Sequence, residues 1–195
     1  MTKLALFISG TGGNALNLAR ACADGRVAAE PVLVLASTPK AGGLARLEGI
    51  RSKVVERKAF DSDEAFSEAC YGAAEAAGAT VICLAGWLKK LWVPERWEGR
   101  ILNIHPGLLP RFGGAGMYGM HVHRAVLAAG EKESGCTVHL VDNEFDHGRV
   151  LLERRVPVLP GDTPETLQAR VYAQEMNAYP EALAAFLISV EPAEP

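Results

Sequence analysis

The segment Asn103-Ile104-His105-Pro106 places two chemically versatile side chains side by side. It closes an apolar run over 100–105, which predicts a buried strand. Strand alternation sends Asn103 and His105 to one face and Ile104 to the other. An amide can stabilise an oxyanion and an imidazole can move a proton. Because ligands bind beyond the carboxyl ends of parallel strands, we predict that this pair is catalytic rather than part of a hydrogen-bonded core.

A carboxylate that can serve this pair lies in the polar turn over 142–148. Acidic and Asn side chains in turns are usually only solvated turn formers. If the turn folds over the same crevice, Asp146 lies beside His105. A neighbouring carboxylate raises the pKa of an imidazole and stabilises its charged form.

A glycine-rich loop, Ser9-Gly10-Thr11-Gly12-Gly13-Asn14, stands between a predicted strand and a predicted helix. Gly10, Gly12 and Ala15 fit a dinucleotide-binding pattern. No acidic residue follows the second strand, where Ala36-Ser37-Thr38 occurs, so a single phosphate is favoured over a dinucleotide. A tight turn without a ligand is the alternative, and the loop alone leaves the two about even.

A zinc site is the competing hypothesis for the histidines. His121 and His123, with His105, His139 and Asp146, supply ligand types but no established zinc spacing. Residues two apart at the start of a helix do not share a face. We therefore expect no metal.

Strand-like and helix-like patterns alternate along the chain, which predicts an α/β fold. A Rossmann-like, mostly parallel sheet flanked by helices is expected, with an antiparallel addition to its edge in the C-terminal half. The last helix begins near Asp162, runs towards Val190 and is expected to be interrupted near Pro180. The tail over 191–195 should fray. The predicted strands cover 3–9, 32–36, 53–56, 80–85, 100–105, 136–141 and 150–158, and the predicted helices 14–24, 42–49, 62–77 and 122–129.

The composition is that of a single globular domain covering residues 1–195. The formal charge is −3, from 20 Lys and Arg against 23 Asp and Glu, which argues against non-specific nucleic-acid binding. The N-terminal apolar run over 4–8 is too short for a signal peptide or membrane span. The 4 cysteines show no CxxC spacing, and three of them lie in apolar stretches typical of buried free thiols. We expect a cytoplasmic protein with small-molecule substrates.

Four segments, in order, resemble the formyltransferase family that uses 10-formyltetrahydrofolate. They are SGTGGN at 9–14, LAGW at 84–87, NIHPGLLP at 103–110 and SGCTVHLVDNEFDHGRVL at 134–151. The resemblance covers nearly the whole chain and implies the formyltransferase fold. It divides the domain into a phosphate-binding half (1–105) and a second half (106–195) with a loop, edge strands and the last helix. The short single domain is similar to members that formylate glycinamide ribonucleotide in purine synthesis.

The resemblance also implies roles for individual residues. Asn103, His105 and Asp146 match the catalytic residues of the family. Positions that match the segments binding the acceptor substrate are Gly12, Gly13, Asn14, Ala15, Leu16 and Glu175. Positions that match the folate-binding segments are Leu88, Lys89, Lys90, Leu91, Val141, Asp142, Asn143, Glu144 and Phe145.

The mechanism implied is direct transfer of the formyl group to an amine, with 10-formyltetrahydrofolate as co-substrate and no metal. The assembly expected is a monomer or homodimer. Asn103 and a protonated His105 would stabilise the developing oxyanion, while Asp146 organises a water that shuttles the proton. The segment over 111–119 is longer and richer in glycine than in better-known members, and Asp63 replaces a basic residue near the folate tail. Another amine acceptor, hydrolysis of the formyl folate, or a non-catalytic nucleotide-binding domain are the alternatives.

Overall fold

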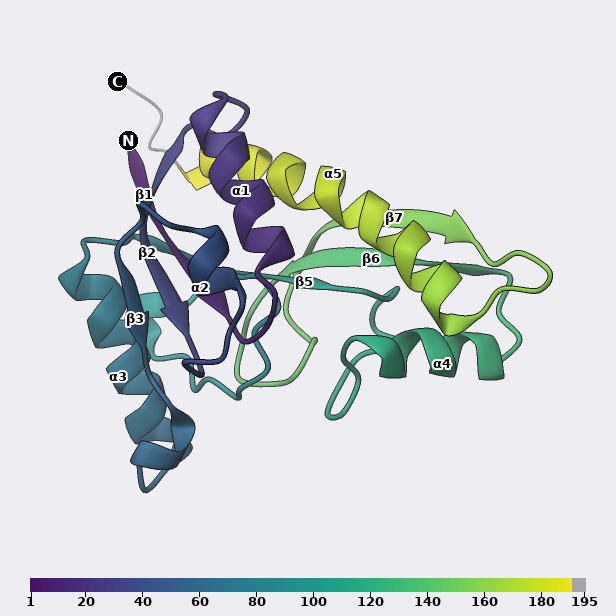
Figure 1. Cartoon of the computed structure of the whole chain (residues 1–195), viewed down its shortest axis with the longest axis horizontal. Coiled ribbons are helices and arrows are strands. Elements are labelled where there is room, and N and C mark those ends of the chain that lie inside the picture. The colour runs from purple at the N-terminus through teal and green to yellow at the C-terminus, as the bar shows by residue number, and fades with distance from the viewer. Residues whose placement is uncertain (191–195) are drawn as a thin grey trace.

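The computed structural model describes residues 1–190, which form an α/β domain around one sheet (Figure 1). The tail that we expected to fray, 191–195, lies outside the described residues. In chain order the elements are β1 (Thr2–Ile8), α1 (Gly13–Ala23), β2 (Ala29–Ala36), α2 (Gly43–Arg46), β3 (Ser52–Val54), η1 (Arg57–Ala59), α3 (Asp63–Ala76), β4 (Val81–Leu84), η2 (Glu95–Trp97), β5 (Ile101–His105), α4 (Met120–Ala128), β6 (Glu133–Leu140), β7 (Val150–Pro157) and α5 (Pro164–Val190).

The sheet has seven strands in the order β3-β2-β1-β4-β5-β6-β7. The first five pair in parallel, as expected for strands joined by helical crossovers. β6 and β7 follow each other without an intervening helix and pair antiparallel, β6 against β5 and β7 against β6. The predicted fold class, including the antiparallel addition in the C-terminal half, is confirmed.

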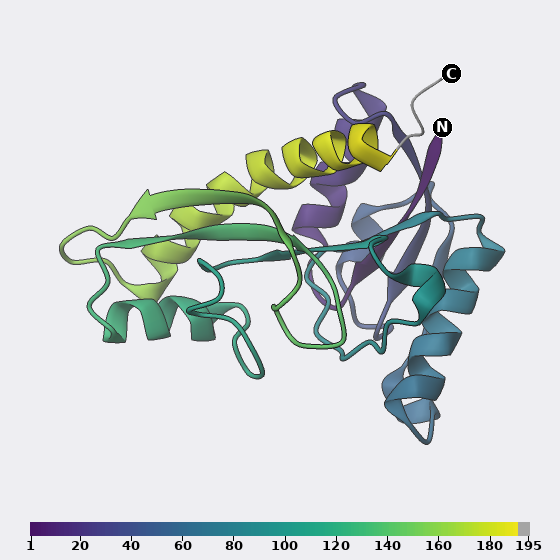
Figure 2. The same cartoon turned by 180° about the vertical axis from the view of Figure 1, so that it is seen from behind.

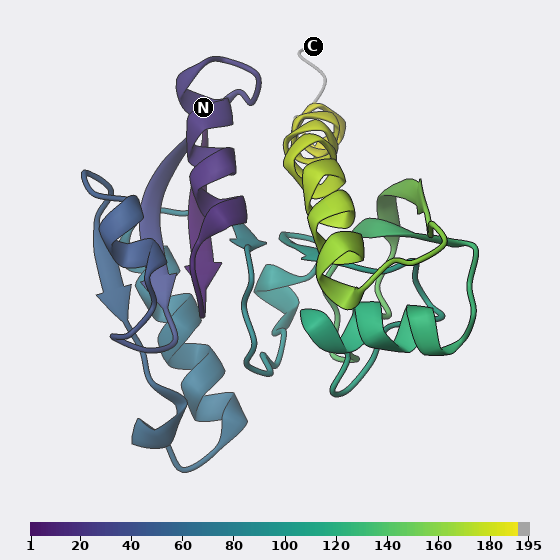
Figure 3. The ribbon, with the colours of Figure 1, turned by 45° about the vertical axis from the view of Figure 1, so that its right-hand side comes forward.

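Helices cover both faces of the parallel part, which explains the continuous apolar runs of its strands. In β1, Leu4, Leu6 and Ile8 face the core formed with α1 and α5. The intervening Ala5 and Phe7 face the core formed with α3. Figure 3 shows the two halves side by side, with α5 on the part of the second half that lies next to α1.

The last helix runs from Pro164 to Val190 without a break, so the predicted interruption near Pro180 is wrong. Proline has no N–H, so Pro180 cannot bond the carbonyl of Met176, four residues earlier. The Asn17 amide of α1 donates to that carbonyl instead, at 2.7 Å. Tertiary packing therefore supplies the partner that the helix lacks.

Two loops lie near the end of β5: the loop from β5 to α4 and the loop from β6 to β7 (Figure 2). Both loops carry residues predicted to be functional. Within residues 1–190, no helix is long and apolar enough to cross a membrane. The 4 cysteines, all in the described part, are free thiols, and Cys70, Cys83 and Cys136 are buried.

Candidate active site

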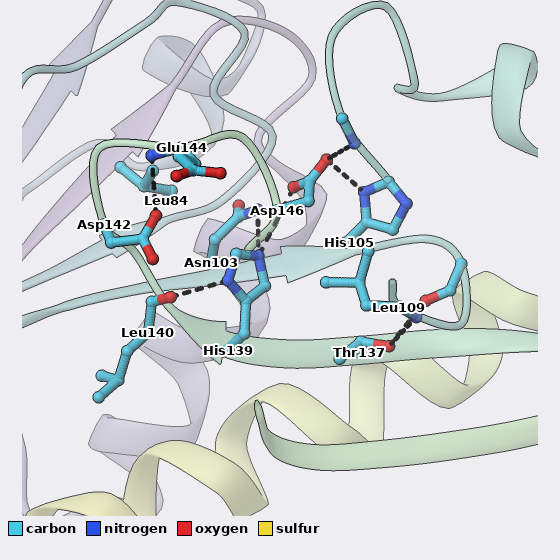
Figure 4. A network of polar contacts seen from close by, with 12 residues as sticks. Leu84, Asn103, His105, Leu109, Thr137, His139, Leu140, Asp142, Glu144 and Asp146 are labelled. Carbon is cyan, nitrogen blue, oxygen red and sulfur yellow. Dashed lines mark hydrogen bonds and ion pairs between the residues drawn. The ribbon is translucent and has the colours of Figure 1, made fainter. Parts of the chain in front are cut away.

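The carboxyl end of β5 presents Asn103 and His105, and the antiparallel strand β6 organises both. In the β5–β6 register, Asn103 lies opposite His139 and His105 lies opposite Thr137. The Thr137 hydroxyl donates to the Gly107 carbonyl at 2.8 Å and accepts the Leu109 N–H at 3.2 Å. This hydrogen-bonded turn fixes where the chain leaves the strand after His105 (Figure 4).

Asp146 reaches the same point from the β6–β7 loop. Its Oδ2 atom lies 3.5 Å from His105 Nδ1, and its Oδ1 atom lies 3.6 Å from His139 Nε2 (Figure 4). The Gly114 N–H donates to Oδ2 at 3.0 Å. Burial alone would raise the pKa of Asp146, but His139, the charge of His105 and the Gly114 N–H together hold the pKa below its ordinary value. Asp146 is therefore ionised at neutral pH.

His105 lies between two acceptors, the Asp146 carboxylate at Nδ1 and the Phe112 carbonyl at Nε2. The side chain is only 3% exposed, and this burial lowers its pKa more than the charge of Asp146 and the contact with the Phe112 carbonyl raise it. His105 Nε2 lies 2.6 Å from the Phe112 oxygen. A carbonyl oxygen can only accept, so the ring carries its proton on Nε2.

His139 was not predicted as a catalytic-site residue, yet it fixes the Asn103 side chain. Its Nδ1 lies 2.8 Å from the Leu140 carbonyl, so Nδ1 carries a proton. Its Nε2 lies 3.1 Å from the Asn103 amide nitrogen, within hydrogen-bond distance. The second amide N–H of Asn103 remains for a ligand. No sequence pattern marked His139 for this role, because it depends on the β5–β6 register.

The glycine-rich loop lies at the N-terminus of α1, next to the same crevice. Gly12 has a φ of 69°, and a side chain there would come within 2.7 Å of the Gly43 Cα atom. No side chain caps the helix, and its first turn contains no acidic residue. The Arg46 guanidinium donates to the Thr11 carbonyl at 3.0 Å and brings positive charge to the loop. Uncapped N–H groups and the helix dipole favour an anion here.

Glu175 reaches this loop from α5. It is 7% exposed and accepts a 2.7 Å hydrogen bond from the Asn14 amide. Burial raises the pKa of the Glu175 carboxyl above its ordinary value, and the bond from Asn14 lowers it only in part. The Oδ1 atom of Asn14 is buried and has no hydrogen-bond partner within residues 1–190. A buried acceptor of this kind suits a donor on a bound ligand.

These groups border one cavity of about 410 Å³, which is a typical size for a small-molecule site. Ala15 and Leu16 do not line it: the Ala15 side chain is in the core, and the Leu16 N–H already bonds the Gly12 carbonyl. Of the residues predicted to bind or react, those that line the cavity are Gly12, Gly13, Asn14, Leu88, Lys89, Lys90, Leu91, Asn103, His105, Val141, Asp142, Glu144, Phe145, Asp146 and Glu175.

Asn143 and Lys90, predicted to bind folate, are engaged with the protein. Asn143 does not line the cavity, because its amide is bonded to the Val93 backbone. The Lys90 ammonium donates to the Asn143 carbonyl and lies 4.6 Å from the centre of the Phe145 ring. Asp63, which replaces a basic residue of the family, pairs with Arg57.

The histidines do not form a metal centre. Across the described chain, no cluster of three or more His, Cys, Asp or Glu side chains could hold a metal ion. His121 is exposed and packs edge-on against Tyr118, whereas His123 is buried and lines the cavity. Burial lowers the pKa of His123 to about 4.

Comparison with known proteins matches the formyl transferase family model to residues 2–183. The chain belongs to this family. Phosphoribosylglycinamide formyltransferase of Haemophilus influenzae is 35% identical over 184 residues, covering 92% of this chain and 84% of that protein. The crystal structure of phosphoribosylglycinamide formyltransferase from Brucella melitensis is 42% identical, with a TM-score of 0.84, covering 99% of this chain and 98% of that one.

Some curated relatives of this formyl transferase are much longer. The trifunctional purine biosynthetic protein adenosine-3 of Drosophila melanogaster is 41% identical over 188 residues, which cover 93% of this chain. The chain spans only 14% of the length of that protein.

The glycine-rich segment after β5 lies against two residues of the candidate site. Its first residues close over them, because the Phe112 carbonyl meets His105 and the Gly114 N–H meets Asp146. A side chain at Gly113 would come within 2.4 Å of Leu109 and 2.9 Å of the Asp146 Cβ atom. The sequence marked this segment as unusual but did not indicate that it contacts both catalytic side chains.

Proposed function

We propose that the protein transfers the formyl group of 10-formyltetrahydrofolate to the amino group of glycinamide ribonucleotide, a step of purine biosynthesis. The observation that carries the proposal is the position of Asn103, His105 and Asp146. They line one cavity together with an anion-binding helix terminus and a partly apolar wall. Pure nucleotide binding does not need this set of three side chains.

The acceptor substrate suits the half of the cavity formed by α1 and α5. Its phosphate would be bound by the N–H groups of Gly12, Gly13 and Asn14, as is typical of helix N-termini. Its hydroxyl and amide groups offer donors to the unpaired Asn14 Oδ1. Glu175, next to Asn14, would contact the ribose.

The folate suits the opposite wall. Leu88, Leu91, Val141 and Phe145 line the cavity there and provide apolar surface for flat rings. Asp142 and Glu144 line the same wall and offer carboxylates to ring N–H groups. The co-substrate supplies the formyl carbon that the acceptor amine attacks.

The three catalytic side chains divide the work of the transfer. The second N–H of Asn103 stabilises the negative charge that develops on the formyl oxygen. His105 contributes as a donor through Nε2–H, which requires it to exchange the Phe112 carbonyl for the substrate. Ionised Asp146 receives, through a water, the proton that the amine loses, and returns it through the water to the folate nitrogen as the bond from that nitrogen to the formyl carbon breaks. Holding the two substrates together supplies much of the remaining rate enhancement.

An absorbance assay tests the proposal directly. Purified protein is mixed with a 10-formyl folate analogue, with and without glycinamide ribonucleotide, and release of the deformylated folate is followed. Release that depends on the ribonucleotide supports both donor and acceptor. Release without the ribonucleotide indicates a hydrolase. In a further arm the ribonucleotide is replaced by another amine, and release that depends on that amine identifies a different acceptor. No release in any arm contradicts formyl transfer and favours a binding domain.

A further inference from the structure

The backbone of Asp146 is in an unusual conformation. Its φ is 54°, and it is the only residue other than glycine with a positive φ within residues 1–190. The left-handed region is unfavourable for an L-residue, and such a residue persists only where its surroundings hold it. The side chain that faces both His105 and His139 therefore depends on whatever anchors its loop.

Asn143, three residues earlier, supplies that anchor. Its Oδ1 accepts the Val93 N–H at 2.8 Å, and its Nδ2 donates to the Val93 carbonyl at 3.2 Å. The Asn143 carbonyl also accepts from the Lys90 ammonium. The amide thus pairs with both polar groups of one buried backbone residue, much as a neighbouring strand would.

Apart from the contacts of Asp146 itself, the other bonds of this turn are internal. Asp142 accepts the Glu144 N–H at 2.8 Å and pairs with His147 at 2.9 Å. In the described part of the chain, Asn143 alone among residues 142–145 makes hydrogen bonds to another segment. The internal bonds lock the shape of the turn, and Asn143 ties the residues before Asp146 to the segment that contains Val93.

We propose that Asn143 is a positioning residue that fixes Asp146 against the two histidines. An amide suits this role, because its oxygen accepts from the N–H while its nitrogen donates to the C=O of the same residue. An Asp at this position keeps the acceptor but faces the Val93 carbonyl with negative charge. The kinetic part of this proposal rests on the proposed formyl transfer, whereas the geometric part does not.

The kinetic test compares Asn143→Ala and Asn143→Asp with Asn177→Ala. Asn177 is a matched control: an exposed Asn of α5 whose amide donates to the Ala173 carbonyl. We expect kcat to fall about tenfold in Asn143→Ala, by less in Asn143→Asp and not in the control. KM for glycinamide ribonucleotide should stay within about twofold, because the acceptor loop is elsewhere. In Asn143→Ala the acid limb of the plot of kcat against pH should move to higher pH, because a displaced Asp146 loses the contacts that lower its pKa.

The geometric test needs no substrate. Histidine titrations are followed by NMR in the wild type, Asn143→Ala and Asp146→Asn, with the His105 signal assigned from His105→Gln. Loss of the carboxylate charge lowers the pKa of His105, so Asn143→Ala should move that titration towards the one in Asp146→Asn. A wild-type titration in Asn143→Ala overturns the proposal, whatever reaction the protein catalyses. A wild-type kcat with only a lower Tm also overturns it.

Discussion

The proposed acceptor loop and the proposed catalytic edge of this formyl transferase are built in opposite ways. The loop between β1 and α1 is contiguous in sequence, and its shape follows from the close approach of Gly12 to Gly43. The catalytic edge combines β5, β6 and the β6–β7 loop, and its side chains are held by bonds between residues far apart in the chain. One region depends on backbone shape, and the other depends on a network of side chains.

This difference predicts which kinetic quantity each region controls. Substitutions that distort the loop should weaken acceptor binding and lower the free energy of unfolding. The groups expected to bind the acceptor there are backbone N–H groups, whose positions depend on the shape of the whole loop. Damage to the network should lower turnover while binding persists. Variants in the two regions are therefore expected to fall into separate classes.

Asp146→Asn should have the largest effect on turnover. The substitution keeps the shape of the side chain but removes the proton acceptor, so kcat should fall about 10³-fold. Binding of glycinamide ribonucleotide, measured by calorimetry, should remain within about twofold of wild type. Turnover close to wild type would remove Asp146 from the mechanism. Loss of acceptor binding would show that the side-chain network does not control turnover separately from binding.

Gly12→Ala should damage the acceptor loop through its backbone. The positive φ and the contact with Gly43 leave no room for a methyl group. We expect the free energy of unfolding to fall by about 3 kcal/mol and KM for the acceptor to rise more than tenfold. Gly72→Ala in α3 is the control, since nothing lies within 4 Å of a side chain there. Equal stability of the two variants in chemical denaturation would show that the Gly12–Gly43 contact does not shape the loop.

The sequence was sufficient to predict the parts of this molecule that depend on local pattern. Strand alternation put Asn103 and His105 on one face, and the lack of an intervening helix put β6 and β7 antiparallel. The partnership of Asn103 with His139 requires the register between two strands, which no local pattern specifies. The lowered pKa of His105 likewise requires its depth of burial, which the sequence-based argument from Asp146 alone left out.

Glu175→Gln should change the pH dependence of stability. A carboxyl whose pKa is raised by folding contributes stability below its ordinary pKa, and that contribution is lost as pH rises through the folded-state value. Gln carries no such dependence. At pH 8 the variant should melt about 3 °C above wild type, equivalent to about 1 kcal/mol, and the difference should vanish near pH 4. The same Tm difference between the variant and wild type at both pH values would mean that burial does not raise the pKa of Glu175.

The smallest effect concerns α5, which packs against both halves. Asn17→Ala removes the donor that satisfies the Met176 carbonyl and should cost about 1 kcal/mol of unfolding free energy. Pro180→Ala restores an N–H that can bond the same carbonyl within the helix. In the Pro180→Ala background the cost of Asn17→Ala should therefore shrink by about half or more, which a double-mutant cycle from urea denaturation measures. Additive effects would show that the proline and the asparagine do not compensate each other. The stabilisation that keeps α5 continuous at Pro180 would then have to come from the apolar contacts of this helix.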